Sequence, residues 1–176
     1  NGTVEIIETA WTKAAAEREE KLTEESLQKN PKGPPRYALP ELRVYDPQQR
    51  LILHEVGISP GKTAAALDDR ISSGRPINGP SLQATLADLE TRDHRPAAER
   101  IRKGGRITIV DYWAEWCVPC KALEKELVAW AAEQPGGTVQ LVRAEADLMK
   151  LARASGDKVI MMKKDASGKL VKQEVN

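Results

Sequence analysis

The chain has few cysteines, little net charge and no long apolar run. Only two of its 176 residues are cysteine and only two are histidine. Its 27 basic and 26 acidic residues leave a formal net charge of +1, so the composition indicates no basic surface for nucleic acid. No apolar stretch approaches the roughly 20 residues of a membrane-spanning helix. We therefore expect neither nucleic-acid binding nor a membrane span, and the two cysteines become the main lead to a function.

Cys117 and Cys120 stand between a predicted strand and a predicted helix. Residues 107–113 are β-branched, aromatic and nearly all apolar, which is typical of a buried central strand. Residues 121–134 repeat apolar side chains on one helical face, and a Pro-Gly-Gly sequence ends that pattern. Cys117 is therefore expected at the start of a helix. Cys120 follows about one turn later, close enough for a disulfide.

A helix N-terminus favours redox chemistry at a cysteine. The free N–H groups and the dipole of the first turn stabilise a negative charge, so they lower the pKa of a thiol from its usual value near 8.5. A Cys117 thiolate can attack a disulfide, and Cys120 can resolve the mixed disulfide that forms. Three alternatives stay open: a structural disulfide, a buried inert pair, and a zinc site. A zinc site would need further ligands from His54 or His94, and no spacing links either to the cysteines.

The sequence from Trp113 to Lys121, with Asp111 six residues before the first cysteine, resembles the active-site segment of the thioredoxin superfamily. The likeness is dense around the WCVPC motif and continues as a pattern over residues 96–176. It implies an α/β fold in which helices flank a central mixed sheet. It also implies that Cys117 is an exposed nucleophile, Cys120 a buried resolving thiol and Asp111 a buried proton relay. For Asp111, a carboxylate at a strand end facing solvent remains an alternative.

Other residues near the motif are expected to shape the site. Trp116, Val118 and Pro119 are predicted to form the surface that substrates touch. Val118 and Pro119 replace the Gly-Pro of thioredoxins proper, so the reduction potential of thioredoxin is not carried over. Arg143 stands near the place of the lysine that usually partners the buried aspartate in this family. Because arginine does not release its proton, we expect it to hold Asp111 ionised.

The C-terminal part departs from the family pattern at a proline. The family places a cis-proline before the strand that faces the active site. That strand is predicted at residues 158–164, and no proline precedes it after Pro135. A helix is predicted at 147–155 and a hairpin at 159–164 and 169–175, after which the chain stops. The resemblance therefore implies a site without its usual docking loop and a sheet without the family's last helix.

Residues 1–95 are predicted to form an α/β extension in front of a redox domain at residues 96–176. The predicted elements are a helix at 9–28, a hairpin with strands at 42–45 and 51–56, and helices at 59–72, 81–90 and 96–103. The long helix is expected to pack along an edge of the domain or to bind a partner.

The two predicted hairpins resemble each other. Five residues of one align at a constant offset with five of the other: Asp46, Arg50, Leu51, Glu55 and Val56 with Asp165, Lys169, Leu170, Glu174 and Val175. In that register Pro40 stands where the family's cis-proline would be, opposite Val159. We hypothesise that residues 36–72 belong to a degenerate half of a thioredoxin-like unit that completes the sheet.

These features predict a thiol–disulfide oxidoreductase that exchanges disulfides with protein substrates and uses no cofactor and no metal. The alternative is a non-catalytic docking or redox-sensing module. The resemblance implies electron transfer with a redox partner protein, such as a membrane-embedded thiol reductase. The lack of further cysteines favours an oxidising compartment such as the periplasm, although cytosolic redox proteins share this composition. The chain has no secretory signal and begins without methionine, which indicates a processed or truncated product.

Overall fold

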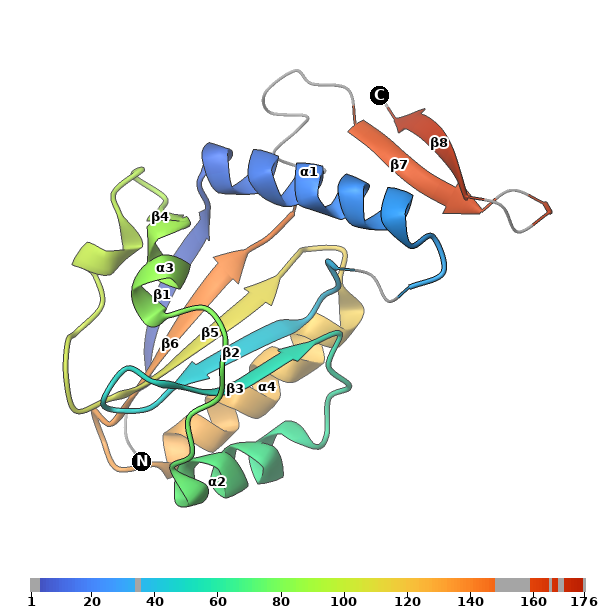
Figure 1. The fold of residues 1–176 in the computed structure, drawn as a ribbon. Coiled ribbons are helices and arrows are strands. Elements are labelled where there is room, and N and C mark those ends of the chain that lie inside the picture. The colour runs from blue at the N-terminus through green and yellow to red at the C-terminus, as the bar shows by residue number, and fades with distance from the viewer. Residues whose placement is uncertain (1–3, 34–35, 148–158, 165, 168–169, 176) are drawn as a thin grey trace.

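The computed structural model describes residues 4–33, 36–147, 159–164, 166–167 and 170–175. Most of these residues build one six-stranded mixed sheet with helices on both faces (Figure 1). Its strands are β1 (Glu5–Trp11), β2 (Glu41–Tyr45), β3 (Leu51–Val56), β4 (Leu89–Thr91), β5 (Ile107–Trp113) and β6 (Val139–Glu145). Their order across the sheet is β3-β2-β5-β6-β1-β4. The α/β class and the flanked central sheet predicted from the sequence are confirmed.

Helices cover the two faces of the sheet with separate apolar clusters. The helices are α1 (Lys13–Lys29), α2 (Thr63–Ser73), α3 (Leu82–Ala87) and α4 (Val118–Glu133), with a short 3₁₀ helix, η1 (Ala97–Glu99). On the face that α1 and α3 cover, the apolar cluster includes Val110 and Val142 of the sheet. On the other face, α2 and α4 pack on Ile109 and Leu141 (Figure 1).

β5 runs through the middle of the sheet and determines which way the site residues point. It pairs in parallel with β6 and antiparallel with β2, so both of its edges are bonded. Ile109 packs with α4, and side chains alternate between the faces along a strand. Asp111, two residues later, therefore lies on the same face as α4. The register sets Arg143 of β6 opposite Asp111.

The neighbour of β5 on one side comes from the N-terminal part of the chain. β2 pairs with β5, and β3 pairs with β2 as the outer strand of the hairpin. The Leu39–Pro40 peptide bond that leads into β2 is cis. The expectation that residues 158–164 face the active site without a preceding proline is therefore wrong. The strand beside β5 is β2, and Pro40 precedes it.

The C-terminal hairpin forms, but outside the main sheet. β7 (Val159–Lys164) and β8 (Leu170–Val175) pair antiparallel as a separate two-stranded sheet, drawn apart from the six strands in Figure 1. At the constant offset between the hairpins, Lys163 corresponds to Val44, and Lys172 to Leu53. Val44 and Leu53 are buried, so lysines in their places would bury charged groups. The N-terminal hairpin is the better fit to β5. That residues 36–72 belong to a degenerate half of a thioredoxin-like unit stays a prediction.

Several predicted boundaries need correction. The helix expected at 9–28 begins only at Lys13, because Thr9, Ala10 and Trp11 complete strand β1. The Thr12 side chain accepts a hydrogen bond from the N–H of Ala15 at 3.2 Å and so marks the true start of α1. This helix lies across a face of the sheet, not along an edge (Figure 1).

The remaining corrections concern shorter elements. The helix expected at 59–72 starts at Thr63, and the one expected at 81–90 ends at Ala87 before β4. The helix expected at 96–103 is only the three-residue η1. Most of the helix expected at 147–155 lies outside the described residues. Among the described residues, no helix has both the length and the apolarity to cross a membrane.

Replacing Leu42 with alanine tests whether β2 belongs to the core. Leu42 is fully buried in the cluster that also holds Leu123 and Leu127 of α4. Removing it should lower the free energy of unfolding by about 2–5 kcal/mol. Val56→Ala, on the same hairpin but 43% exposed, should lower it by less than about 1 kcal/mol. Urea unfolding followed by tryptophan fluorescence measures both, and equal losses would contradict the placement of β2.

Candidate redox site

The cysteine pair lies at the N-terminus of α4, as predicted. Cys117 is the residue that caps the helix, and its Sγ accepts a hydrogen bond from the backbone N–H of Cys120 at 3.3 Å. The two cysteines form a disulfide with a Cα–Cα distance of 5.3 Å. Pro119 lies in the first turn, where the N–H that proline lacks would have had no partner within the helix. No acidic residue lies in that turn. The positive end of the helix dipole therefore acts on the Cys117 sulfur without a competing carboxylate in that turn.

Both cysteines are shielded from solvent in the disulfide form. Cys120 is fully buried, as the resemblance implied, but Cys117 is only 3% exposed. Leu39 and Trp113 pack against the pair together with the buried Ala114. The exposed Cys117 implied by the resemblance is therefore wrong for this form, because the chain leading into β2 covers the sulfur.

The three residues predicted to shape the substrate surface are all exposed. Trp116 has 55% and Val118 74% of its surface in contact with solvent, and Pro119 is also exposed. Large apolar side chains with this much exposure are uncommon in the described part of the chain. The disulfide thus lies beneath an apolar surface patch built by its own neighbours.

Asp111 is fully buried, which excludes the solvent-facing alternative. Neither of its carboxylate oxygens has a hydrogen-bond partner among the described residues. The nearest cation is Arg143, whose Nε lies 3.7 Å from Oδ2, beyond hydrogen-bond distance. Burial raises the pKa of Asp111 to about 7, and the positive charge of Arg143 only partly opposes that rise. The expectation that Arg143 holds Asp111 ionised is therefore wrong.

Arg143 cannot serve Asp111 alone, because other groups share its charge. Its Nη1 lies 3.0 Å from Glu124 of α4 and 3.8 Å from Glu8 of β1. The guanidinium carbon lies 4.4 Å from the ring centroid of Trp113. The stacking and the Glu124 contact hold the guanidinium plane. Its hydrogen-bonding atoms thus face Glu124, and its Nε is left without a hydrogen bond near Asp111.

Sequence reasoning missed Glu124, Glu8 and the segment before β2. Glu124 lies four residues after Cys120, so it shares a helical face with that cysteine, and this spacing was the one available signal. The hydroxyl of Tyr37 donates a hydrogen bond to the carbonyl of Ala146, which fixes the segment before β2 against the end of β6. Only the match of Pro40 with Val159 indicated that this segment approaches the site.

The zinc interpretation finds no ligand set in the described part of the chain. No group of three or more His, Cys, Asp or Glu side chains there could hold a metal ion. His54 lies 2.9 Å from Glu41, and His94 lies 2.8 Å from Glu90. Both histidines are thus engaged in polar contacts of their own.

Comparison with known proteins agrees with this geometry. The family model for thioredoxin matches residues 91–166, which include β5, the cysteine pair, α4 and β6. Residues 91–166 belong to the thioredoxin superfamily. No curated protein and no solved structure matched the chain. A thioredoxin domain with a disulfide between Cys117 and Cys120 gives the chain a thiol–disulfide redox function of the general oxidoreductase kind. The matched range of this thioredoxin domain excludes β2, the strand that pairs with β5.

Replacing Asp111 with asparagine tests its raised pKa. An unfolded aspartate ionises near pH 4, but the folded protein keeps Asp111 protonated up to about pH 7. The folded state therefore binds the extra proton between these values, and wild-type stability falls as pH rises through this window. The free energy of unfolding of wild type relative to Asp111→Asn should drop by up to about 4 kcal/mol from pH 4 to pH 8.

Urea unfolding of the oxidised proteins across this pH range measures the difference. Asp69→Asn, which removes an exposed carboxylate of α2, controls for the loss of one charge. A difference between wild type and Asp111→Asn that does not change with pH would show that Asp111 has an ordinary pKa.

Proposed function

We propose that the protein is a thiol–disulfide oxidoreductase that exchanges disulfides with protein substrates through Cys117 and Cys120. The observation that carries this proposal is the position of the Cys117 sulfur at the N-terminus of α4, where it accepts the N–H of Cys120. Once the disulfide is reduced, the same N–H and the helix dipole stabilise a thiolate on Cys117. A stabilised thiolate is the attacking species in disulfide exchange.

In the reducing direction, the Cys117 thiolate attacks one sulfur of a substrate disulfide. A bond forms between Cys117 and that sulfur, and the other substrate sulfur leaves as a thiolate. Cys120 then loses its proton and attacks the Cys117 sulfur, which releases the second substrate thiolate. The substrate gains two electrons, and the protein returns to its Cys117–Cys120 disulfide. The oxidising direction is the same sequence in reverse.

Asp111 is the group proposed to accept the proton of Cys120. It lies on the face of the sheet that α4 covers, and Cys120 is in the first turn of α4. Its pKa of about 7 lets it bind or release a proton near neutral pH, which suits an acid–base group. Its two oxygens have no hydrogen bonds among the described residues, so they are available to a thiol.

Protein substrates are favoured by the surface around the disulfide. Trp116, Val118 and Pro119 present apolar area to solvent beside a sulfur that is almost buried. A partner that covers this area would gain hydrophobic contact while reaching the sulfur. We also propose a redox partner protein, such as a membrane-embedded thiol reductase, and an extracytoplasmic location. The support for the location is that the chain has no cysteine besides the reactive pair.

The 3% exposure of Cys117 favours one other function, a redox-sensing module without turnover. In such a module the disulfide would form and break, but Leu39 and Trp113 would keep large substrates away. Catalysis of disulfide exchange separates the two functions.

Insulin reduction by dithiothreitol tests for turnover. The wild-type protein should accelerate the reaction, and Cys117→Ser should return it to the uncatalysed rate, because the one remaining cysteine, Cys120, is fully buried. Cys120→Ser should instead remain joined to insulin chains as a mixed disulfide, visible on a non-reducing gel. A wild-type rate no faster than dithiothreitol alone would overturn the oxidoreductase and favour the redox-sensing module.

Shortening the exposed apolar side chains tests the substrate surface. The double variant Trp116→Ala/Val118→Ala should raise KM for insulin by roughly thirtyfold with kcat nearly unchanged, because about 1 kcal/mol of contact per side chain, about 2 kcal/mol together, is lost. Ile6→Ala, which shortens a 41% exposed side chain on β1, is the matched control and should leave KM unchanged. Exchange with a small disulfide should be the same for all three proteins. Unchanged KM in the double variant would show that substrates bind elsewhere.

A further inference from the structure

Strand β1 has an open edge over half of its length. On one side it pairs with β6 from Glu5 to Ala10, but on the other side it pairs with β4 only from Thr9 to Trp11. The chain turns away after β4, where the N–H of Thr91 donates to the carbonyl of Arg95 at 2.9 Å. Among the described residues, no strand therefore pairs with this side of residues 5–8. An open strand edge offers unpaired backbone N–H and C=O groups to an extended chain.

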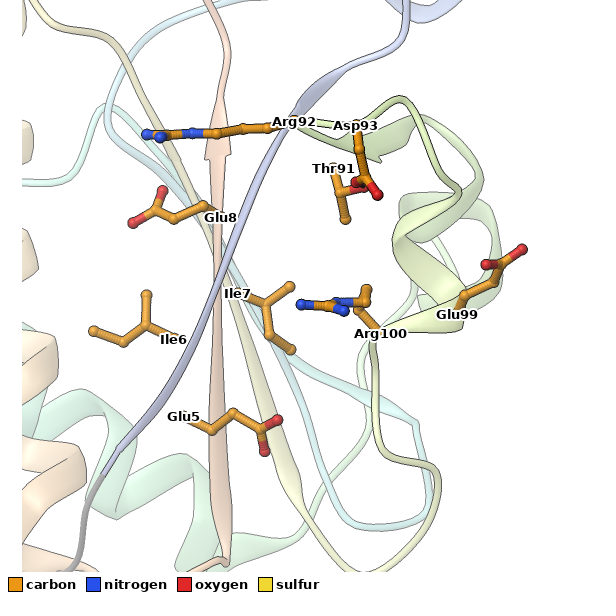
Figure 2. A pocket seen from close by; sticks show the side chains of 9 residues that line it. All are labelled: Glu5, Ile6, Ile7, Glu8, Thr91, Arg92, Asp93, Glu99 and Arg100. Atoms are coloured by element: carbon orange, nitrogen blue, oxygen red, sulfur yellow. Dashed lines mark hydrogen bonds between the residues drawn. The ribbon is translucent and has the colours of Figure 1, made fainter.

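A cavity lies along this open edge. Its volume is about 590 Å³, and its walls are residues 5–8 of β1, the turn at Thr91, Arg92 and Asp93, and the end of η1 with Glu99 and Arg100. Figure 2 shows the Arg100 side chain pointing toward Ile7 across the cavity. The cavity is long and open enough for a few residues of extended peptide beside the strand.

The charges that line the cavity are unevenly neutralised. Its four carboxylates all have partners: Glu5 lies 3.4 Å from Arg102 and 3.2 Å from Arg106, Glu8 lies 3.8 Å from Arg143, Glu99 lies 2.7 Å from Arg95, and Asp93 accepts a hydrogen bond from Thr91. The guanidinium groups of Arg92 and Arg100 make no ion pair and no hydrogen bond with any described residue, and both side chains are exposed. Asp93 has no ion pair among the described residues and keeps its own negative charge, but Arg92 and Arg100 remain the two cations of the lining that are available to an acidic side chain of a ligand.

We propose that the open edge of β1 at residues 5–8 binds an extended acidic segment of a partner protein as an added β-strand. Backbone hydrogen bonds to β1 would supply affinity, and Arg92 and Arg100 would select acidic side chains. Ile7 faces the cavity beside Arg100, and Ile6, which is 41% exposed, points to the other face of the sheet. Figure 2 places the Arg92 guanidinium on the side of Glu8 and Ile6 and the Arg100 guanidinium on the side of Ile7, so an acidic segment added to this edge meets an arginine on either face.

Two other occupants fit less well. A second copy of β1, paired antiparallel about its centre, would set Glu5 opposite Glu8, and like charges opposite each other are destabilising. The chain's own C-terminal hairpin carries Lys163, Lys164 and Lys172, so it would bring lysines toward the unpaired arginines Arg92 and Arg100. The acidic partner segment is the occupant that complements these two arginines.

The binding test uses three labelled hexapeptides of the same length. They are acetyl-Glu-Val-Glu-Val-Glu-Val-amide and its matched versions with Gln or Lys in place of each Glu. Fluorescence anisotropy at low salt should show that the acidic peptide binds wild type, that the Gln peptide binds more weakly and that the Lys peptide does not bind. The double variant Arg92→Glu/Arg100→Glu should bind the acidic peptide at least about tenfold more weakly, because two attractive contacts become repulsive.

Arg75→Glu is the matched control for these substitutions. Arg75 lies in the loop after α2, is exposed, makes no ion pair with any described residue and does not line the cavity, so its reversal should leave peptide affinity nearly unchanged. Hydrogen exchange should show that the acidic peptide protects amides within residues 5–8. Two further peptides carry N-methyl groups on either the odd-numbered or the even-numbered residues. One of them should lose binding and the other should keep it, because only one edge of an added strand faces β1.

Four results would overturn the proposal. They are no binding of the acidic peptide, equal binding of this peptide to wild type and to the double variant, protection of amides outside residues 5–8, and equal loss of binding by the two N-methylated peptides. Concentration-dependent dimerisation that protects residues 5–8 without peptide would assign the edge to a second copy instead. Insulin reduction by the same variants should be unchanged, so this test is independent of the proposed redox function.

Discussion

The antiparallel pairing of β2 with β5 is the contact on which the rest of the structure depends. It closes the second edge of the central strand, and it brings Leu39 against the disulfide. It also places Leu42 opposite Asp111, so the carboxylate lies between two bonded strands beneath a helix. Without this pairing, Asp111 would meet water and the cysteines would lose their cover. The redox site is thus assembled from two segments that are far apart in the sequence.

The positive charge of Arg143 beneath α4 is shared unequally among the carboxylates around it. Arg143 is one cation among three carboxylates, and it is oriented by Glu124 and by the ring of Trp113. Asp111 receives the least of this positive charge and loses all of its contact with solvent. Desolvation therefore outweighs the attraction of the cation, and the aspartate keeps a proton near neutral pH. A carboxylate of this kind can exchange protons with a neighbouring thiol without a large energetic penalty in either direction.

Local patterns in the sequence were enough to predict β5, the start of α4 and the hairpin with strands at 42–45 and 51–56. The apolar run of 107–113 and the helical face after Cys120 depend on neighbours in the chain, so they can be recognised without a structure. β1 was missed because Thr9, Ala10 and Trp11 run into an alanine-rich helix, and only the cap at Thr12 separates the two. The thioredoxin resemblance also located the cysteines and the aspartate correctly, because these lie within one continuous segment.

The parts that sequence reasoning could not predict depend on contacts between distant segments. The choice between two similar hairpins for the edge of β5 was settled by burial at Val44 and Leu53, where the other hairpin has lysines. The pKa of Asp111 and the cover over Cys117 follow from tertiary packing that no local pattern encodes. The open edge of β1 likewise became visible only when the extent of β4 was known.

The order of the strands along the chain bears on how the protein folds as it is made. Every strand of the main sheet lies within residues 5–145. The strands β1 to β5 precede the cysteines in the chain, so they leave the ribosome first, and only β6 follows. Translation adds about 5–20 residues per second, and N-terminal segments are free to fold first. The sheet can therefore close around Cys117 and Cys120 as soon as β6 emerges, so that the thiols meet their oxidising or reducing partner in an already folded setting.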